Sequence, residues 1–115
     1  MSDLDELTLL MRQFSEERDW TKFHDPKSLL LALVGEVGEL SELFQWLPAD
    51  GAAMAASQSP LKDRVAEEAA DVLLYLVRLA DVLNINLMNA AAGKLAAAGA
   101  RFDKDEYFGV APVKK

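Results

Sequence analysis

The sequence predicts an all-α protein, and three observations support this prediction. Apolar residues recur at helical spacing, Asp25-Pro26 and Ser59-Pro60 both resemble the start of a helix, and no stretch alternates as a half-buried strand would. The 115 residues are 51% apolar, which suits one domain with a modest core. We expect a four-helix bundle. Because the chain is short, we also expect it to complete its core by associating with copies of itself.

The first predicted helix begins at Ser2 and ends near Arg18. Asp5 lies three residues after Ser2, which is the spacing of a capping box. The apolar positions of this segment recur at helical intervals and include Leu4, Leu7, Met11 and Phe14. Such a one-sided apolar stripe needs a partner surface.

A connector over residues 20–25 holds Trp20, Phe23 and His24. It is interpreted in two ways, and the sequence leaves both open. The aromatic side chains fold over the core, or they form a wall for a planar ligand. His24, taken alone, is more typical of a hydrogen bond within a loop than of a catalytic base.

The second predicted helix covers residues 26–46, with Asp25 as its N-cap and Pro48 as its end. Gly35 and Gly38 each weaken such a helix by roughly 1 kcal/mol relative to alanine. Two glycines at this cost suggest that another helix or a ligand approaches closely. A tight helix crossing alone would be enough to explain them.

The remaining helices follow a connector over residues 47–59, which we expect to be mobile. The third helix should cover residues 60–83, and Asn84-Ile85-Asn86 breaks it. A fourth, alanine-rich helix follows over residues 87–98, with Gly99 as its stop. We assign residues 1–102 to the domain. Residues 103–115 are expected to form an extended, partly disordered tail.

Two pairs of acidic residues lie on the predicted second and third helices. Glu36 and Glu39 are three residues apart, as are Glu68 and Asp71, so each pair shares one helix face. Buried carboxylates are costly unless they are paired or bind a metal. Arg64, four residues before Glu68, offers an ordinary surface ion pair as the simplest alternative. If the helices face each other, the four acids form an all-oxygen site for a hard divalent cation.

The composition excludes several classes of protein. A net charge of −7 argues against binding to a nucleic-acid polymer. The chain has no cysteine and one histidine, which excludes thiol chemistry and sites that need several imidazoles. No apolar run reaches the roughly 20 residues of a membrane span, and acids stand where a signal peptide has bases. A cytoplasmic protein is therefore expected.

Carboxylates without histidine partners suit Mg²⁺ or Mn²⁺ better than zinc or a di-iron centre. Mg²⁺ in proteins is usually bound by a few carboxylates together with phosphate oxygens of a substrate. The residues alone thus suggest metal-assisted phosphoryl or nucleotidyl chemistry. The glycine-rich loop of P-loop enzymes is absent from the sequence.

The sequence resembles the MazG-like all-α nucleoside triphosphate pyrophosphohydrolases. The resemblance covers residues 4–102 and rests on the two acidic pairs and the segments around them. These segments are Arg18-Asp19-Trp20, Phe23-His24-Asp25-Pro26, residues 29–40, Glu42-Leu43-Phe44-Gln45-Trp46, and residues 67–77 with Asp71-Val72-Leu73 and Tyr75-Leu76-Val77.

The resemblance implies Mg²⁺-dependent hydrolysis of a deoxynucleoside triphosphate, dCTP or a modified dCTP, to the monophosphate and pyrophosphate, with Mn²⁺ able to substitute. The two acidic pairs would bind the metal and place the attacking water. The implied substrate-binding residues are Trp20, His24, Trp46, Tyr75, Lys94 and Arg101. The family forms dimers or tetramers in which neighbouring subunits complete each site.

Two departures from the family pattern bear on the implied substrate contacts: the first concerns one phosphate contact, and the second concerns the choice of base. Ala98 stands where relatives often have an asparagine that binds phosphate, and Met11 stands where some have a histidine in the first helix. The alternatives are the same reaction on dUTP or another non-canonical triphosphate, and a non-catalytic helical oligomerisation module whose acids are merely solvated.

Overall fold

The computed structural model describes residues 2–112 and confirms the all-α class. It is 69% helical, and residues 2–112 contain no strand. Four long α-helices, one short α-helix and one 3₁₀ turn follow in the order α1 (Asp3–Glu17), η1 (Thr21–Phe23), α2 (Pro26–Glu42), α3 (Ala52–Ala56), α4 (Leu61–Val82) and α5 (Leu87–Arg101).

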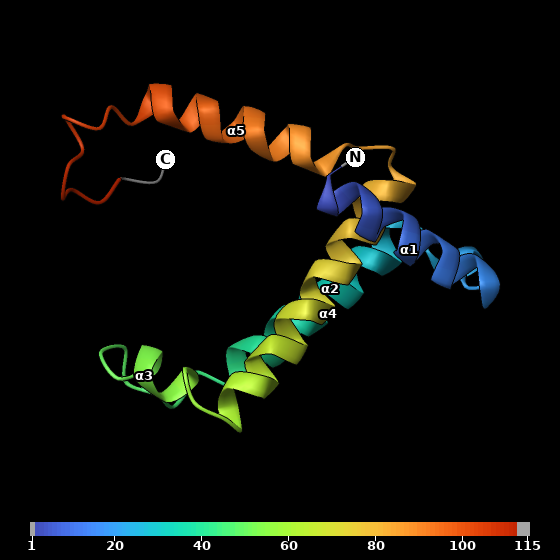
Figure 1. Ribbon diagram of the computed structural model, residues 1–115, viewed down its shortest axis with the longest axis horizontal. Coiled ribbons are helices and arrows are strands. Elements are labelled where there is room, and N and C mark those ends of the chain that lie inside the picture. The colour runs from blue at the N-terminus through green and yellow to red at the C-terminus, as the bar shows by residue number, and fades with distance from the viewer. Residues whose placement is uncertain (1, 113–115) are drawn as a thin grey trace.

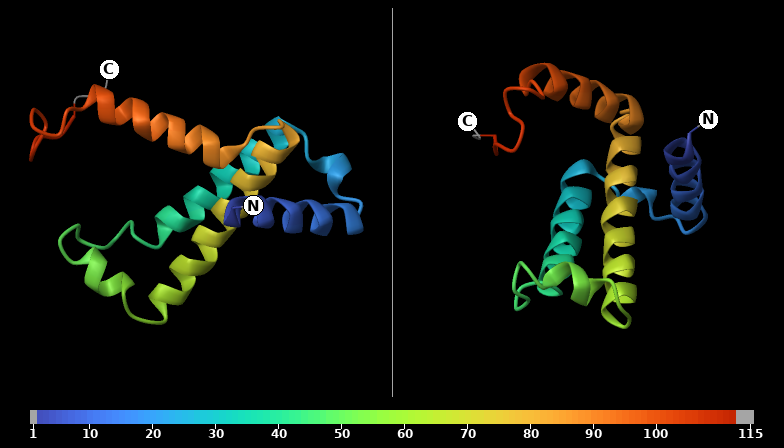
Figure 2. Two further views of the ribbon diagram at one scale, coloured as in Figure 1. Left: turned by 45° about the horizontal axis from the view of Figure 1, so that its top comes forward. Right: turned by 60° about the vertical axis from the view of Figure 1, so that its left-hand side comes forward.

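An antiparallel pair of helices, α2 and α4, forms the centre of the molecule (Figure 1). Helix α1 packs across the end of α4 where α4 finishes, and α3 lies near the opposite end (Figure 2). The buried apolar side chains are those of Leu29 in α2 and of Val77 and Ala80 in α4. The core therefore lies where α1, α2 and α4 meet.

Three of the expected helix starts are present, and one is not. Ser2 and Asp5 form a reciprocal capping box, with both hydrogen bonds 3.1 Å long. The Asp25 carboxylate accepts from the Ser28 amide, and the Asn86 side chain starts α5. The prediction that Ser59 caps the third helix was wrong. Pro60 takes the cap position without a side-chain bond, and the Lys62 amide donates to the Gln58 carbonyl.

Other boundaries also differ from the prediction. Helix α2 stops at Glu42 rather than Trp46, and the chain continues to Leu47 through tighter bonds between residues three apart. Helix α5 runs through Gly99 to Arg101, because that glycine keeps a negative φ and does not act as a stop. The connector over residues 47–59, which was expected to be mobile, contains the short helix α3.

The tail was expected to be extended, but residues 103–112 are largely turns. The amide of Tyr107 donates to the Asp103 carbonyl, and its ring meets Phe102 edge-on at 5.2 Å. Residues 113–115 lie outside the described part of the chain. The division between a domain over residues 1–102 and a tail thus stays a prediction.

The single chain is expanded for its size. Its radius of gyration is 17.4 Å, whereas a compact domain of this length should have about 13 Å. The reason is visible in Figure 1, where α5 projects away from the α2–α4 pair. Within residues 2–112, no helix is both long and apolar enough to cross a membrane.

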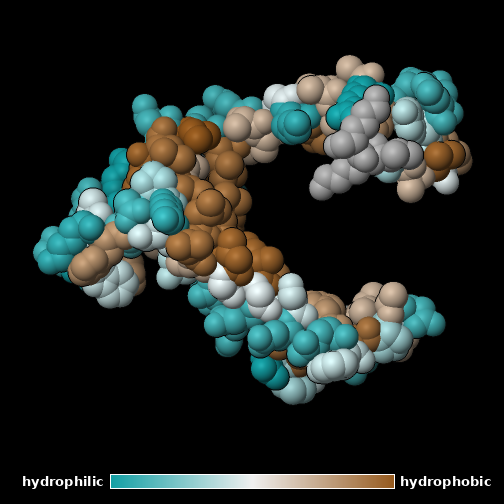
Figure 3. Space-filling view, turned by 180° about the vertical axis from the view of Figure 1, so that it is seen from behind, coloured by the Kyte–Doolittle hydropathy of each residue, from teal (hydrophilic) through white to brown (hydrophobic). Residues whose placement is uncertain are grey.

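Helix α2 leaves an apolar face uncovered within this chain. Leu30, Leu31, Val34 and Val37 are between 44% and 62% exposed. Seen from behind, apolar side chains gather along the inner side of the C-shaped outline (Figure 3). A Cβ added at Gly35 or Gly38 would meet nothing within 4 Å. The tight helix crossing expected at these glycines is therefore not made inside the chain.

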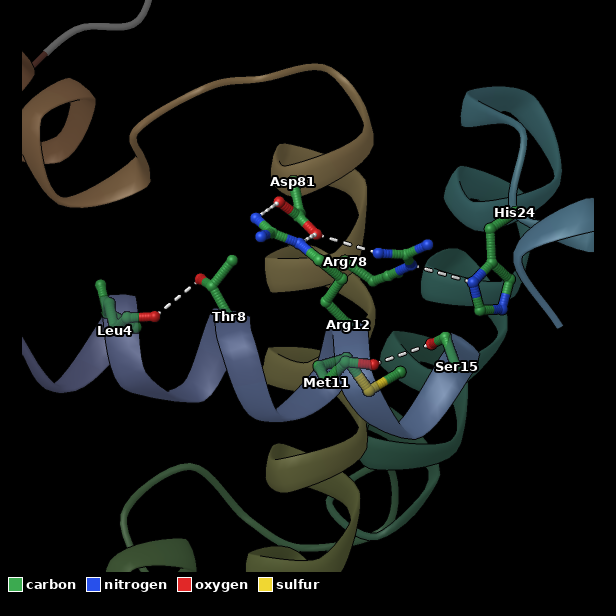
Figure 4. Close-up of polar contacts among 8 residues, drawn as sticks. All are labelled: Leu4, Thr8, Met11, Arg12, Ser15, His24, Arg78 and Asp81. Atoms are coloured by element: carbon green, nitrogen blue, oxygen red, sulfur yellow. Dashed lines mark hydrogen bonds and ion pairs between the residues drawn. The ribbon is translucent and has the colours of Figure 1, made fainter. Parts of the chain in front are cut away.

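A polar network joins α1, α4 and the connector before α2 (Figure 4). Asp81 accepts from Arg12 and from Arg78, with 2.9 Å between its Oδ2 and the donor nitrogen in each case. Arg78 is only 3% exposed and also donates from Nε to Nδ1 of His24 at 2.9 Å. The guanidinium of Arg12, followed by that of Arg78, lowers the pKa of Asp81.

We predict that Asp81→Asn destabilises the fold by about 3 kcal/mol, because it leaves the buried Arg78 without its carboxylate. Urea unfolding at pH 7 measures this loss. Since the pKa of Asp81 is lowered, its contribution is present above the ordinary value of 3.8 and is lost as pH falls through the folded pKa. The difference between the two proteins should therefore shrink below that pH.

Asp19→Asn is the matched control. Asp19 binds Lys22 at 2.9 Å, but both side chains are well exposed, so the loss should stay under about 0.5 kcal/mol. Asparagine also tolerates the positive φ of 55° at this position. Equal losses in the two variants would contradict the view that burial makes the Asp81 network important.

Candidate functional site

A cluster of three carboxylates lies between the two central helices. Glu36 and Glu39 of α2 and Glu68 of α4 each offer an oxygen, and these three oxygens lie within 4.8 Å of one another. The spacing of three residues puts the α2 pair on one face, and the packing of α4 against that helix supplies the third acid. We call these three residues the acidic cluster.

The acidic cluster is costly in the absence of a cation or a proton. Oε2 of Glu36 and Oε2 of Glu68 are buried and have no hydrogen-bond partner among residues 2–112. Burial, followed by the nearby carboxylates of Glu39, Asp71 and Glu68, raises the pKa of Glu36 to about 7. Burial, followed by Glu39, also raises the pKa of Glu68. Like charges in a partly buried site therefore favour a bound proton or a cation.

The surface ion pair between Arg64 and Glu68, which is the simplest alternative to a metal site, does not occur in the described part of the chain. Arg64 and Glu68 line the same hollow, yet no ion pair joins them. The donor set consists only of carboxylate oxygens, two of them buried and unpartnered. Such a set fits a hard divalent cation such as Mg²⁺ or Mn²⁺.

Asp71, the fourth predicted ligand, lies beside the acidic cluster but is not part of it. Its charge raises the pKa of Glu36 and Glu68, so it is close to both. Its side chain also lines an adjoining apolar hollow. The structure thus separates the four acids into a group of three and one at the border of a neighbouring cavity.

The apolar hollow has a volume of about 340 Å³, within the usual range for small-molecule sites. Its aromatic members are Phe14, Trp20 and Tyr75, and the rings of Phe14 and Trp20 meet edge-on at 5.6 Å. The remaining lining residues are Leu7, Leu10, Met11, His24, Asp71 and Leu74. The connector thus contributes to the wall of a cavity, which is what the interpretation as a wall for a planar ligand requires.

A second, more polar hollow lies on the other side of the acidic cluster and has a volume of about 570 Å³. Glu39 and Glu68 line it together with Glu42, Leu43, Gln45, Leu61 and Arg64. The acids therefore lie between an apolar cavity and a polar one.

Three predicted substrate-binding residues are not brought to this place within one chain. Trp46 follows the end of α2 and is 87% exposed. Lys94 and Arg101 lie on α5, which projects away from the α2–α4 pair (Figure 1). Only Trp20, His24 and Tyr75 share a cavity with one of the predicted metal ligands.

Arg78 and the apolar wall from α1 and α4 were not predicted from the sequence. A single charge inside the apolar run of residues 72–80 was the available signal for Arg78. Leu7 and Phe14 were assigned only to an apolar stripe that needs a partner surface. They could not be assigned to a cavity, because the cavity forms only where α1 crosses α4.

The comparisons agree with this architecture. The crystal structure of a pyrophosphatase from Archaeoglobus fulgidus superimposes with a TM-score of 0.82 and 36% sequence identity, covering 90% of this chain and 95% of that one. Among curated relatives, dCTP pyrophosphatase 1 from Homo sapiens is 49% identical over 94 residues, and the protein of that name from Bos taurus is 45% identical over 92.

These matches cover 80% of this chain, which spans only about half (54%) of the length of the curated relatives. The sequence model of the MazG nucleotide pyrophosphohydrolase domain matches residues 24–98, which include all four acids. The chain therefore belongs to the MazG nucleotide pyrophosphohydrolase family.

Proposed function

We propose that this chain hydrolyses a deoxynucleoside triphosphate, dCTP or a modified dCTP, to the monophosphate and pyrophosphate. The observation that carries the proposal is the acidic cluster, with two buried and unpartnered oxygens, next to an aromatic-lined hollow. Family membership and the relatives named dCTP pyrophosphatase 1 support this reaction and this base.

Glu36, Glu39 and Glu68 are proposed to hold Mg²⁺, with Asp71 binding at the border of the apolar hollow. A bound divalent cation polarises phosphate oxygens and lowers the pKa of a coordinated water. The chain's own contribution is to fix the carboxylates on two rigid helices and to orient the water that attacks the α-phosphorus. A carboxylate not used for binding accepts the proton of that water. The bond between the α- and β-phosphates then breaks.

The two hollows suggest how the substrate lies. The base occupies the apolar hollow, where Trp20 and Tyr75 offer aromatic faces and His24 offers a polar group. The phosphates extend past the acidic cluster into the polar hollow, which Arg64 also lines. Stacking on an aromatic side chain contributes about 1–3 kcal/mol per base.

A homo-oligomer is proposed to complete the site. The uncovered apolar face of α2, the projecting α5 and the large radius of gyration all indicate surface that needs a partner. A second copy could bring Trp46, Lys94 and Arg101 to the substrate. Dimer and tetramer both satisfy these observations.

Met11 favours a second candidate substrate for the same reaction. It lines the apolar hollow where some relatives have a histidine, so the hollow offers one polar contact fewer to the base. Another triphosphate, such as dUTP, is then the alternative.

Pyrophosphate release from a panel of nucleoside triphosphates, with Mg²⁺ and then with EDTA, tests the proposal. We expect metal-dependent release that is strongest with dCTP or a 5-substituted dCTP. Strongest release with dUTP would keep the reaction and change the base. A folded protein that releases no pyrophosphate from any triphosphate would favour the non-catalytic oligomerisation module.

We predict that Glu39→Gln and Glu68→Gln each lower kcat at least about a hundredfold with helical content unchanged, because each removes a charge from the acidic cluster. Glu67→Gln is the matched control, since this exposed neighbour of Glu68 is not in the cluster. Steady-state kinetics and far-UV circular dichroism measure both effects. Unchanged turnover in Glu39→Gln would remove this residue from the metal site.

We predict that Mg²⁺ raises Tm, and that the increase is larger at pH 8 than at pH 6. At about 100 times Kd, binding to the folded state alone adds about 2.7 kcal/mol. Because the pKa of Glu36 is raised from 4.5 to about 7, Mg²⁺ must displace a proton at pH 6 but not at pH 8. Because folding raises the pKa of Glu36, the metal-free protein should lose stability as pH rises from 4.5 to about 7.

Thermal melts with Mg²⁺ or EDTA at both pH values measure this effect. Glu36→Gln should show little increase at either pH. An equal increase in the wild type and this variant would place the cation elsewhere.

We predict that Trp46→Ala raises KM several-fold with a smaller change in kcat, because one stacking contact is lost. Phe108→Ala is the matched control, since Phe108 is an equally exposed aromatic residue (88% against 87%) in the predicted tail. Sedimentation velocity on both variants separates the alternatives. An unchanged KM with a lost oligomer would place Trp46 in the subunit interface instead.

A further inference from the structure

The contact between Arg78 and His24 determines which histidine nitrogen carries a proton. Nε of Arg78 lies 2.9 Å from Nδ1 of His24. A guanidinium has only donors, so Nδ1 must accept. In a neutral imidazole whose Nδ1 accepts, the proton is on Nε2. Figure 4 shows Nδ1 facing Arg78, with the other ring nitrogen on the opposite edge.

Two physical effects favour the neutral form of His24. Burial, followed by the positive charge of Arg78, lowers the pKa of His24. Among residues 2–112, no side-chain or backbone group accepts a hydrogen bond from Nε2. That N–H is therefore available to a ligand in the apolar hollow, of which His24 forms part of the wall.

Arg78 is itself firmly held. It is 3% exposed, and a second nitrogen binds Asp81 at 2.9 Å, while Asp81 is also bound by Arg12 of α1. Loss of the Arg78–His24 contact would leave a buried guanidinium nitrogen without its partner, which is costly. The network therefore fixes both the orientation and the tautomer of His24.

We propose that Arg78 is a positioning residue that holds His24 as the Nε2–H tautomer, so that the hollow presents a hydrogen-bond donor to an acceptor atom of the bound base. The inference rests on the proposed function, because the base is the ligand assigned to this hollow. A carbonyl oxygen or unprotonated ring nitrogen of a pyrimidine is the matching acceptor. Arg78 itself has no direct role in the reaction.

Nuclear magnetic resonance of His24 tests the tautomer directly. His24 is the only histidine of the chain, so tag-free protein labelled with ¹⁵N-histidine gives one imidazole in a long-range ¹H–¹⁵N spectrum. At pH 8 we expect a protonated Nε2 and an unprotonated Nδ1 in the wild type. A protonated Nδ1 would overturn the proposal, and this measurement needs no variant to fold and no substrate to be hydrolysed.

Kinetics test whether the tautomer matters for binding. Arg78→Met should raise KM about tenfold, equivalent to one lost hydrogen bond, with kcat within about twofold and with mixed tautomers in the spectrum. Arg12→Met is the matched control, since it also removes a partner of Asp81 but leaves the contact with His24. It should keep the wild-type tautomer and KM.

A double-mutant cycle with His24→Ala separates positioning from general damage to the fold. In the His24→Ala background, Arg78→Met should not raise KM further. An equal further rise would overturn the proposal and leave Arg78 with a structural role. If the wild type hydrolyses no triphosphate, the proposed function fails, whereas the tautomer measured by resonance still decides the positioning of His24.

Discussion

The electrostatic cost of the acidic cluster is the constraint on which the rest of the site depends. The packing of α2 against α4 buries one oxygen each of Glu36 and Glu68 without a hydrogen-bond partner among the described residues. Burial, followed by neighbouring carboxylates, raises the pKa of Glu36 and of Glu68, and the like charges repel one another. In the function proposed above, a divalent cation removes both costs and lets an acidic protein bind a triphosphate through its oxygens.

In the proposed function, the two hollows recognise different parts of the substrate around this cluster. One is lined mainly by apolar and aromatic side chains from α1, α4 and the connector, and the other by polar side chains of α2 and α4. Asp71 lines the first, whereas Glu39 and Glu68 line the second. A nucleotide with a planar base and a charged chain matches this arrangement. The polar network around Asp81 joins α1 to α4 beside the apolar hollow.

The single chain leaves much apolar surface exposed and holds some of the predicted site residues away from the acids. Few side chains are fully buried, although half of the sequence is apolar. The glycines of α2 face open space, and α5 carries two of the predicted substrate-binding residues away from the acids (Figure 1). The proposed homo-oligomer accounts for all three features, because a second copy would cover the apolar face and bring basic groups to the site.

The sequence by itself determined the helical class, the main helix starts at Ser2 and Asp25, and the two acidic pairs, because capping and periodicity are local properties. It could not determine that Gly99 stays inside α5, since a glycine ends a helix only where its φ becomes positive. Only the tertiary structure decided that Asp71 stands apart from the other three acids and that Arg78 reaches His24, 54 residues away. These contacts depend on the crossing of α1 and the connector over α4, which no local pattern specifies.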